Sequence, residues 1–236
     1  MDAPTRLLIH GASGRMGQAL QRLCQEGGGC QVVAAVSRKV GSRAIDGIPQ
    51  FAASELAGVP EFDVAIDFSL PEGFDAILEL CLRRGAALAS GTTGLSSEQQ
   101  SALDVAATRI PLVWASNFSL GVAVLHDLVE RAARALPGWD CDIVEAHHAR
   151  KLDAPSGTAM TLGMAAGEGG ATPRYASIRA GDIVGEHLVQ FSGIGERIEL
   201  AHRATNRDIF ARGALHAARA LVGRAPGRYR VRDLLD

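Results

Sequence analysis

Apolar positions in the first half of the chain form short continuous runs that alternate with stretches of helical spacing. Five of the runs are too short for helices and predict strands, at residues 6–10, 31–36, 64–68, 86–89 and 110–114. Between them, apolar residues recur at helical spacing in residues 18–24, 72–84 and 97–107. Strands that are apolar on both faces indicate a parallel sheet covered by helices on both sides. We therefore expect an α/β fold with a Rossmann-type, doubly wound parallel sheet.

The pattern changes after residue 118. A long apolar-rich stretch at 120–136 predicts a helix, residues 142–147 a strand, and residues 156–166 a second helix. Residues 186–192 and 196–204 alternate around a Gly-Ile-Gly turn, which predicts an antiparallel hairpin. Such a hairpin is foreign to a purely parallel sheet and indicates a second, α+β domain. A last helix at 209–222 fits either domain, and the segment GEGGATP at 167–173 predicts a flexible loop.

Composition adds bounds rather than a function. The chain has 236 residues, 47% of them hydrophobic and 21% charged, with a net charge of -2, so bulk charge favours neither nucleic acid nor an anionic membrane. The four cysteines have no paired, metal-like spacing, which indicates reduced thiols. There is no apolar run typical of a secretion signal or of a membrane helix. We expect a soluble, cytoplasmic protein.

The segment GASGRMG follows the first predicted strand and opens the first predicted helix. Its glycines, Gly11, Gly14 and Gly17, have the spacing G-x-x-G-x-x-G, with Ser13 where a dinucleotide fingerprint has its second glycine. Small residues let the backbone approach a pyrophosphate, and the helix N-terminus offers free N–H groups. Arg15 adds positive charge. A strand-to-helix turn that needs glycine for its geometry alone is the alternative.

The end of the second predicted strand bears on the choice of dinucleotide. NAD sites usually place a carboxylate there for the ribose 2′-hydroxyl, whereas this strand ends in Ser37, Arg38 and Lys39. Two cations without a carboxylate suit a 2′-phosphate, so we expect NADPH to be used at least as well as NADH. A solvated basic turn is the plain alternative.

Two more polar turns follow predicted strands, where open α/β sheets bind their ligands. In SGTTG, the residues Gly91, Thr92 and Thr93 can contact a nicotinamide, and in WASNFSLG residues 115–118 can line its ring and carboxamide. Asp67 and Ser69 follow the third strand at the same edge. Each turn alone also fits ordinary turn and cap chemistry.

The segment EAHHARKLDAPSGTA concentrates polar chemistry in residues 145–159. His147 and His148 are neighbours that would face opposite sides of a strand, so we expect no metal site here. Lys151 and the turn at 156–158, which opens a helix, form an anion site for a carboxylate. One histidine can then donate a proton near the bound anion. A surface strand with a capped helix and incidental histidines is the alternative.

Six segments together resemble the dihydrodipicolinate reductase family: GASGRMG, DFSLPEG, SGTTG, ASNFSLGV, EAHHARKLDAPSGTA and RAGDIVGEH. They occur in the family's order through most of the chain. The resemblance implies NAD(P)H-dependent reduction of 4-hydroxy-tetrahydrodipicolinate to tetrahydrodipicolinate, in lysine and diaminopimelate biosynthesis. It also implies a dinucleotide-binding domain at 1–118 and 206–236, and a substrate-binding and oligomerisation domain with a mixed sheet at 119–205. The family's usual assembly implies a homotetramer.

Site residues follow from the matching motifs. Those implied for the cofactor are Gly11, Ala12, Ser13, Gly14, Arg15, Met16, Arg38, Gly91, Thr92, Thr93, Ala115, Ser116, Asn117 and Phe118. His147 is implied as proton donor or acceptor and Lys151 as proton donor. His148, Gly157 and Thr158 would hold the carboxylates, with Ser156 as a helper. Ser37 replaces the family's common acidic residue, which supports NADPH, and shorter loops at 40–59 and 163–174 put part of the oligomer contact in question.

Three other functions remain open from the residues alone. Another two-domain NAD(P)-dependent oxidoreductase would keep the glycine turn but has no need of the histidine–lysine segment. A non-catalytic NADP-binding sensor would bind cofactor without turnover. A histidine–metal hydrolase would require a bound metal.

Overall fold

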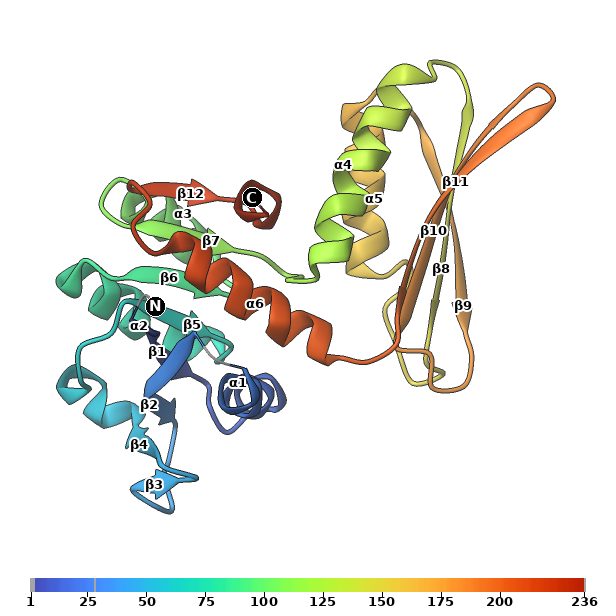
Figure 1. The fold of residues 1–236 in the computed structure, drawn as a ribbon. Helices are drawn as coiled ribbons and strands as arrows, with labels where there is room; N and C mark the ends of the chain where they lie inside the picture. The colour runs from blue at the N-terminus through green and yellow to red at the C-terminus, as the bar shows by residue number, and fades with distance from the viewer. Residues whose placement is uncertain (1–2, 28, 236) are drawn as a thin grey trace. The chain divides into compact units, whose positions relative to one another are not determined.

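The computed structural model describes residues 3–27 and 29–235. The chain forms two compact units (Figure 1). One unit consists of Met1–Phe118 with Phe210–Asp236, and the other of Ser119–Ile209. The sequence had placed the return to the first domain at residue 206, four residues earlier.

The described residues of the first unit form an eight-stranded sheet with the order β12-β7-β6-β5-β1-β2-β4-β3. Neighbouring strands are parallel except for the pair β3 and β4. The strands are β1 (Thr5–His10), β2 (Cys30–Ser37), β3 (Ala44–Ile45), β4 (Ile48–Ala52), β5 (Val64–Asp67), β6 (Ala87–Ser90), β7 (Pro111–Trp114) and β12 (Gly227–Tyr229). Because β2 and β5 flank β1 on opposite sides, the strand order reverses beside β1, which is where such sheets bind ligands.

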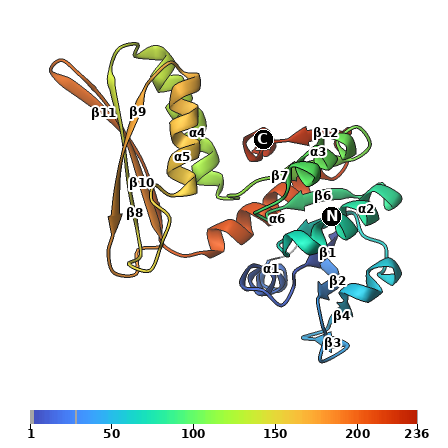
Figure 2. The ribbon, with the colours of Figure 1, turned by 180° about the vertical axis from the view of Figure 1, so that it is seen from behind.

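Helices cover both faces of this sheet, as Figures 1 and 2 show. They are α1 (Arg15–Glu26), η1 (Ala53–Gly58), α2 (Pro71–Arg84), α3 (Ser97–Ala106), α6 (Asp208–Leu221) and η2 (Val231–Leu234). One core cluster packs Phe74, Ile77 and Leu103 of α2 and α3 against strand residues that include Leu8, Val36 and Leu88. Strands apolar on both faces bury both sides only under two helical layers, and the predicted Rossmann-type sheet is confirmed.

The second unit is a four-stranded mixed sheet with the order β11-β10-β8-β9. Strand β10 is antiparallel to both β8 and β11, whereas β8 and β9 are parallel. The strands are β8 (Asp140–His147), β9 (Pro173–Arg179), β10 (Gly185–Gly193) and β11 (Glu196–Ala204). Helices α4 (Leu120–Ala135) and α5 (Gly157–Glu168) pack side by side on one face of this sheet (Figure 1). Their core with the sheet includes Leu125, Val129, Leu162, Ile143 and Phe191.

The predicted loop at 167–173 is confirmed only for residues 169–172. Helix α5 continues to Glu168, and β9 begins at Pro173. Gly169 is a close-packing residue rather than a hinge, because a Cβ there would lie 2.6 Å from the carbonyl oxygen of Glu130 on α4. Strand β9 was missed because most of its residues are exposed, so no alternation of apolar and polar positions marks it. Backbone pairing with β8 makes it a strand.

The compact segment at 40–59 also contains structure that apolar patterning did not indicate, namely β3, β4 and η1. Strand β12 near the C-terminus was missed for the same reason as β9, since it is only three residues long and none of them is buried. None of the helices formed by the described residues is long and apolar enough to cross a membrane.

Candidate active site

A cavity of about 1100 Å³ opens in the first unit at the carboxyl ends of β1, β2 and β5. Its lining includes glycines of the turn after β1, the end of β2, and the segment that leads into α2. The lining residues are His10, Gly11, Ser13, Gly14, Val36, Ser37, Arg38, Lys39, Ala53, Phe68, Ser69, Leu70, Glu72 and Gly73. A cavity of this size at the reversal of strand order has the position of a dinucleotide site.

The glycine turn needs its glycines for close approach. Gly11 has a φ of 81°, and a Cβ there would lie 2.4 Å from the carbonyl oxygen of Phe68. A Cβ on Gly17 would lie 2.5 Å from the carbonyl oxygen of Gly11. Gly14, which lines the cavity, caps α1 without a side-chain hydrogen bond, so no cap side chain takes up the N–H groups of the first helical turn. These features fit a bound pyrophosphate.

The end of β2 presents a hydroxyl and two cations. The buried Ser37 Oγ accepts a hydrogen bond of 3.0 Å from the backbone N–H of Ser13, which ties β2 to the glycine turn. Arg38 and Lys39 are exposed, line the cavity and have no ion pair among the described residues. The end of β2 therefore presents positive charge at the position where NAD sites usually place a carboxylate for the ribose 2′-hydroxyl.

The remaining residues predicted for the cofactor lie at the same sheet edge but do not line this cavity. Ala12 is buried beneath the turn, and Arg15 and Met16 lie in the first turn of α1. Gly91, Thr92 and Thr93 follow β6, and Ala115, Ser116, Asn117 and Phe118 follow β7. The hydroxyl of Thr92 is buried and donates its hydrogen to Asp67. Phe118 packs edge-on against Phe68, with 5.7 Å between ring centres.

Asp67 forms hydrogen bonds with several segments at this sheet edge, a role that the sequence did not reveal. Its fully buried carboxylate accepts hydrogen bonds from Ser90 Oγ at 2.8 Å and Thr92 Oγ1 at 2.7 Å. It also contacts His10 Nδ1 at 2.9 Å and accepts from the N–H of Ser69 at 3.2 Å. Burial acts to raise the pKa of Asp67, but these partners, His10 foremost, lower it below its ordinary value. The carboxylate joins the ends of β1, β5 and β6.

The polar segment at 145–159 is built in the second unit from the end of β8, a loop and the start of α5. Ser156 is the N-cap of α5, and its Oγ accepts a hydrogen bond from the N–H of Ala159. Gly157 is exposed and Thr158 half-buried at the first helical positions. A helix start with small side chains is suited to a carboxylate, because its N–H groups and dipole attract negative charge.

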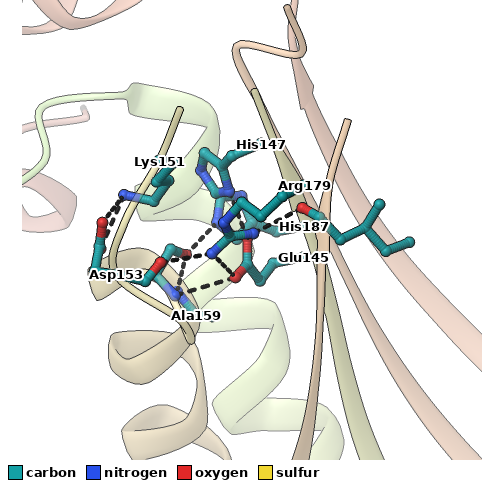
Figure 3. Close-up of polar contacts among 9 residues, drawn as sticks. Glu145, His147, Lys151, Asp153, Ala159, Arg179 and His187 are labelled. Atoms are coloured by element: carbon teal, nitrogen blue, oxygen red, sulfur yellow. Dashed lines mark hydrogen bonds and ion pairs between the residues drawn. The ribbon is translucent and has the colours of Figure 1, made fainter. Parts of the chain in front are cut away.

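Glu145 and His147 lie two residues apart on β8 and are both buried (Figure 3). His147 Nδ1 contacts the carboxylate of Glu145 in a short hydrogen bond. The guanidinium of Arg179 donates to both oxygens of the same carboxylate, at 2.6 and 2.9 Å. Burial would raise the pKa of Glu145, but Arg179, Ser177 and His147 together lower it to about 2. The carboxylate is therefore ionised.

His148 and Lys151 lie in the loop that follows. His148 is half-buried, and its Nδ1 is buried without a hydrogen-bond partner. Burial, followed by the charges of Arg207 and Arg150, lowers the pKa of His148. The ammonium group of Lys151 pairs with the exposed Asp153 at 2.8 Å. The loop thus carries the imidazole and ammonium groups that the sequence singled out as anion ligands.

His187 is a residue of this site that sequence reasoning passed over. It lies on β10, opposite Glu145 in the strand register, and its ring packs edge-on against that of His147. Its Nε2 is 3.2 Å from Ser156 Oγ, and its Nδ1 is buried without a partner. Burial lowers the pKa of His187 to about 4, so its ring is neutral at neutral pH. The RAGDIVGEH motif contained this histidine and Arg179, but nothing in the spacing connected them to residue 145.

Comparison with known proteins covers the chain from end to end. The family model described as "Dihydrodipicolinate reductase, N-terminus" matches residues 5–118, and "Dihydrodipicolinate reductase, C-terminus" matches residues 121–235. Among solved structures, a dihydrodipicolinate reductase from Paenisporosarcina sp. TG-14 superposes with a TM-score of 0.82 over 97% of this chain and 98% of that one. Its sequence is 23% identical, so it bears on the fold.

Curated relatives are much more similar in sequence. The 4-hydroxy-tetrahydrodipicolinate reductase of Stenotrophomonas maltophilia (strain R551-3) is 74% identical, over 100% of this chain and 99% of the relative. That of Xylella fastidiosa (strain 9a5c) is 66% identical over the full length of both chains. The resemblance stated from the motifs is confirmed. The chain belongs to the dihydrodipicolinate reductase family, the NAD(P)H-dependent oxidoreductases whose curated members are named 4-hydroxy-tetrahydrodipicolinate reductases.

Proposed function

We propose that this chain reduces 4-hydroxy-tetrahydrodipicolinate to tetrahydrodipicolinate, a step of lysine and diaminopimelate biosynthesis, with His147 and Lys151 as its acid–base residues. The observation that carries the proposal is the Glu145–His147 pair, which lies on β8 directly before a loop with Lys151 and the start of α5. A proton donor and an anion site are thereby held on adjoining elements of one unit. A sensor that only bound cofactor would have no use for this arrangement.

The substrate's two carboxylates would be held by groups that the fold already orders. Gly157 and Thr158 offer N–H groups at the start of α5, Ser156 fixes that start, and Lys151 and His148 supply positive charge or hydrogen bonds. The solved relative from Paenisporosarcina sp. TG-14 is described as dipicolinate bound, and dipicolinate is a dicarboxylate of the same class.

The chain's own groups would move the protons. In the reaction, water leaves with the hydroxyl of one ring carbon and a hydrogen of the neighbouring carbon, and a hydride and one proton are added to the ring. A reduced nicotinamide bound in the first unit supplies the hydride. His147 Nε2 makes no hydrogen bond to the described residues and is available to donate a proton to the ring carbon or to the departing hydroxyl. Lys151 is the second donor of the pair, once substrate displaces Asp153 from its ammonium group.

NADPH is the preferred cofactor in this proposal. Ser37 leaves no carboxylate at the end of β2, and both Arg38 and Lys39 line the cavity. A guanidinium there can form charge-assisted hydrogen bonds to a 2′-phosphate, which NADH lacks. The glycine turn, from Gly11 to Met16, and the turns after β6 and β7 would contact the rest of the cofactor.

The test is an assay with substrate made fresh from aspartate semialdehyde and pyruvate by a condensing synthase. Oxidation of NADPH and NADH is followed in parallel by loss of absorbance. Substrate-dependent oxidation, faster with NADPH at equal concentrations, is the expected result. Cofactor binding without oxidation would favour the sensor alternative, and equal rates with both cofactors would remove the role of Arg38.

The second unit also supports a homotetramer. Only one face of its sheet is covered by α4 and α5. On the other face, the register aligns Ala176, Val144, Leu188 and Ala201 across the four strands, and Ile178 is 49% exposed beside them. A row of small and apolar side chains is suited to pairing with a second copy. Light scattering that returned a monomer mass at micromolar concentration would contradict this assembly.

A cytoplasmic location is consistent with the thiols. All four cysteines, Cys24, Cys30, Cys81 and Cys141, are free, and two of them are buried. Free thiols of this kind persist in a reducing compartment. Fractionation of cells that express the tagged chain tests the location.

A further inference from the structure

Glu145 is buried at a position that is unfavourable for a carboxylate unless both of its oxygens are hydrogen-bonded. The residue is 0% exposed. An ionised carboxylate in such a place is strongly destabilising unless its oxygens are paired. Oε1 accepts from Arg179 at 2.6 Å and from the N–H of Ser156 at 3.2 Å, and Oε2 accepts from Arg179 at 2.9 Å and from His147. Both oxygens of the carboxylate are therefore hydrogen-bonded, and one of them contacts the ring of His147.

We infer that Glu145 is a positioning residue for the reaction: it holds the His147 ring through Nδ1–H, so that Nε2 is the atom that carries and transfers the proton. This inference rests on the proposed role of His147 as a proton donor. An ionised carboxylate can only accept hydrogen bonds, so the contact with Nδ1 requires the hydrogen to be on that nitrogen. The same contact stabilises the imidazolium form that must exist before the proton is donated.

Arg179 explains why the carboxylate stays ionised beside a histidine. Its two hydrogen bonds to Glu145 are supplemented by a third, at 2.6 Å, to the carbonyl oxygen of Asp153 in the loop that carries Lys151. Arg179 thereby links the end of β9 to both the carboxylate and the loop (Figure 3). A carboxylate clamped in this way cannot take the proton from His147, and the ring keeps it for the substrate.

The neighbours of the ring suit an imidazolium that points Nε2 away from Glu145. A Cβ on Gly185 would lie 3.1 Å from Nε2, a tight contact, so glycine leaves room beside that nitrogen. His187 packs edge-on at 5.2 Å between ring centres and adds no charge, because burial keeps it neutral. The titratable and charged groups around the ring are Glu145 on β8, Arg179 on β9, His187 on β10, and His148, Lys151 and Asp153 in the loop.

The variant Glu145→Gln tests the inference, because it keeps the shape of the side chain and removes its charge. We expect kcat to fall about 100-fold or more, while the KM for substrate and the Kd for NADPH change less than about threefold. The high-pH fall of the kcat profile should move to lower pH, because the imidazolium loses its anionic partner. Glu145→Asp, which retains the charge on a shorter side chain, should restore part of kcat.

Asp142→Asn is the matched control. Asp142 lies on the same strand and accepts two hydrogen bonds, at 2.8 and 2.9 Å, from Arg174 on the same neighbouring strand, but it contacts no histidine. Its loss should leave kcat and the pH profile unchanged. If Glu145→Gln behaves like this control, or lowers kcat without moving the profile, the inference is overturned.

A second measurement holds even if Glu145→Gln does not fold. Nitrogen-15 NMR of the His147 ring in the unaltered protein distinguishes the two neutral tautomers. The Nδ1–H tautomer is expected, and the Nε2–H tautomer would overturn the inference. Failure of the proposed function has a different signature, because His147→Gln would then retain its activity whatever the result for Glu145.

Discussion

Each of the two units contains one buried carboxylate in contact with a histidine, but the two pairs are built differently. In the first unit, Asp67 contacts the ring of His10, and hydroxyl and backbone groups donate the other hydrogen bonds to its carboxylate. In the second unit, Glu145 has the permanent charge of Arg179 on both oxygens and the ring of His147 beside it. Both are carboxylate–histidine pairs, but the two carboxylates position different parts of the structure.

In the proposed function, Asp67 supports the cofactor site, whereas Glu145 supports the residue that transfers a proton. The partners of Asp67 come from three strand ends, so its carboxylate fixes the relative positions of three turns. The partners of Glu145 fix one imidazole and the loop after it. Removing the first carboxylate should therefore disturb folding and cofactor binding, and removing groups near the second should disturb turnover.

The largest effect is expected for Lys151→Ala. If Lys151 donates a proton and holds a carboxylate, kcat should fall about 100-fold to 1000-fold and the KM for substrate should rise, while the Kd for NADPH in the first unit stays the same. Steady-state kinetics and a fluorescence titration measure these quantities. Arg150→Ala, an exposed cation next to it in the loop, is the control. An effect on KM alone would make Lys151 a binding residue without a part in proton transfer.

The next effect is on folding. Asp67→Asn should lower the free energy of unfolding by about 2 to 3 kcal/mol, because it leaves buried donors without a charged acceptor. It should also raise the Kd for NADPH about tenfold, with the His147 site intact. Asp63→Asn, which breaks a partly exposed ion pair with Arg6 in the same unit, should cost less than about 1 kcal/mol. Urea unfolding compares the two, and equal losses would deny Asp67 its special role.

Acid should destabilise the second unit in two steps. The pKa of His187 is about 4 when folded against an ordinary 6.5, so the unfolded chain binds more protons between these values. The free energy of unfolding should fall as pH drops from 6.5 to 4, on the order of 1 kcal/mol per pH unit. Glu145, with its pKa lowered from 4.5 to about 2, extends the loss below pH 4.5. Urea unfolding across this range measures the loss.

Two variants assign the steps. His187→Gln should reduce the upper step, since it removes a buried histidine that resists protonation. Glu145→Gln should reduce the lower step. A pH dependence that neither variant alters would place the acid-sensitive groups elsewhere.

The smallest effect concerns cofactor preference. Arg38→Ala should reduce the ratio of kcat/KM for NADPH over NADH about tenfold, because one exposed cation beside a 2′-phosphate is lost. Arg43→Ala removes an exposed cation that pairs with Glu55 and does not line the cavity, so the ratio should stay constant. An unchanged ratio in Arg38→Ala would mean that Lys39 or the backbone recognises the phosphate.

The sequence by itself determined the central strands of the first unit's sheet, which are β1, β2, β5, β6 and β7, the hairpin of the second unit and the family. Short runs that are apolar throughout, such as residues 64–66, can be buried on both sides only between two helical layers, and the spacing of Gly11, Gly14 and Gly17 requires a tight turn. The motif around His147 and Lys151 indicated the segment for which we propose acid–base chemistry, because its residue types are costly in a core and suited to anions. Local patterns are sufficient where the physical cause is local.

Tertiary structure alone decided which groups support those residues. Glu145 contacts Arg179, 34 positions away, and lies opposite His187 through strand pairing. Asp67 collects donors from strands that meet only in the folded sheet. Strand β9 exists because β8 supplies its hydrogen bonds, and Gly169 is glycine because α4 lies against it. Burial, strand register and charge pairing depend on contacts between segments that are far apart in the sequence, so no local sequence pattern predicts them.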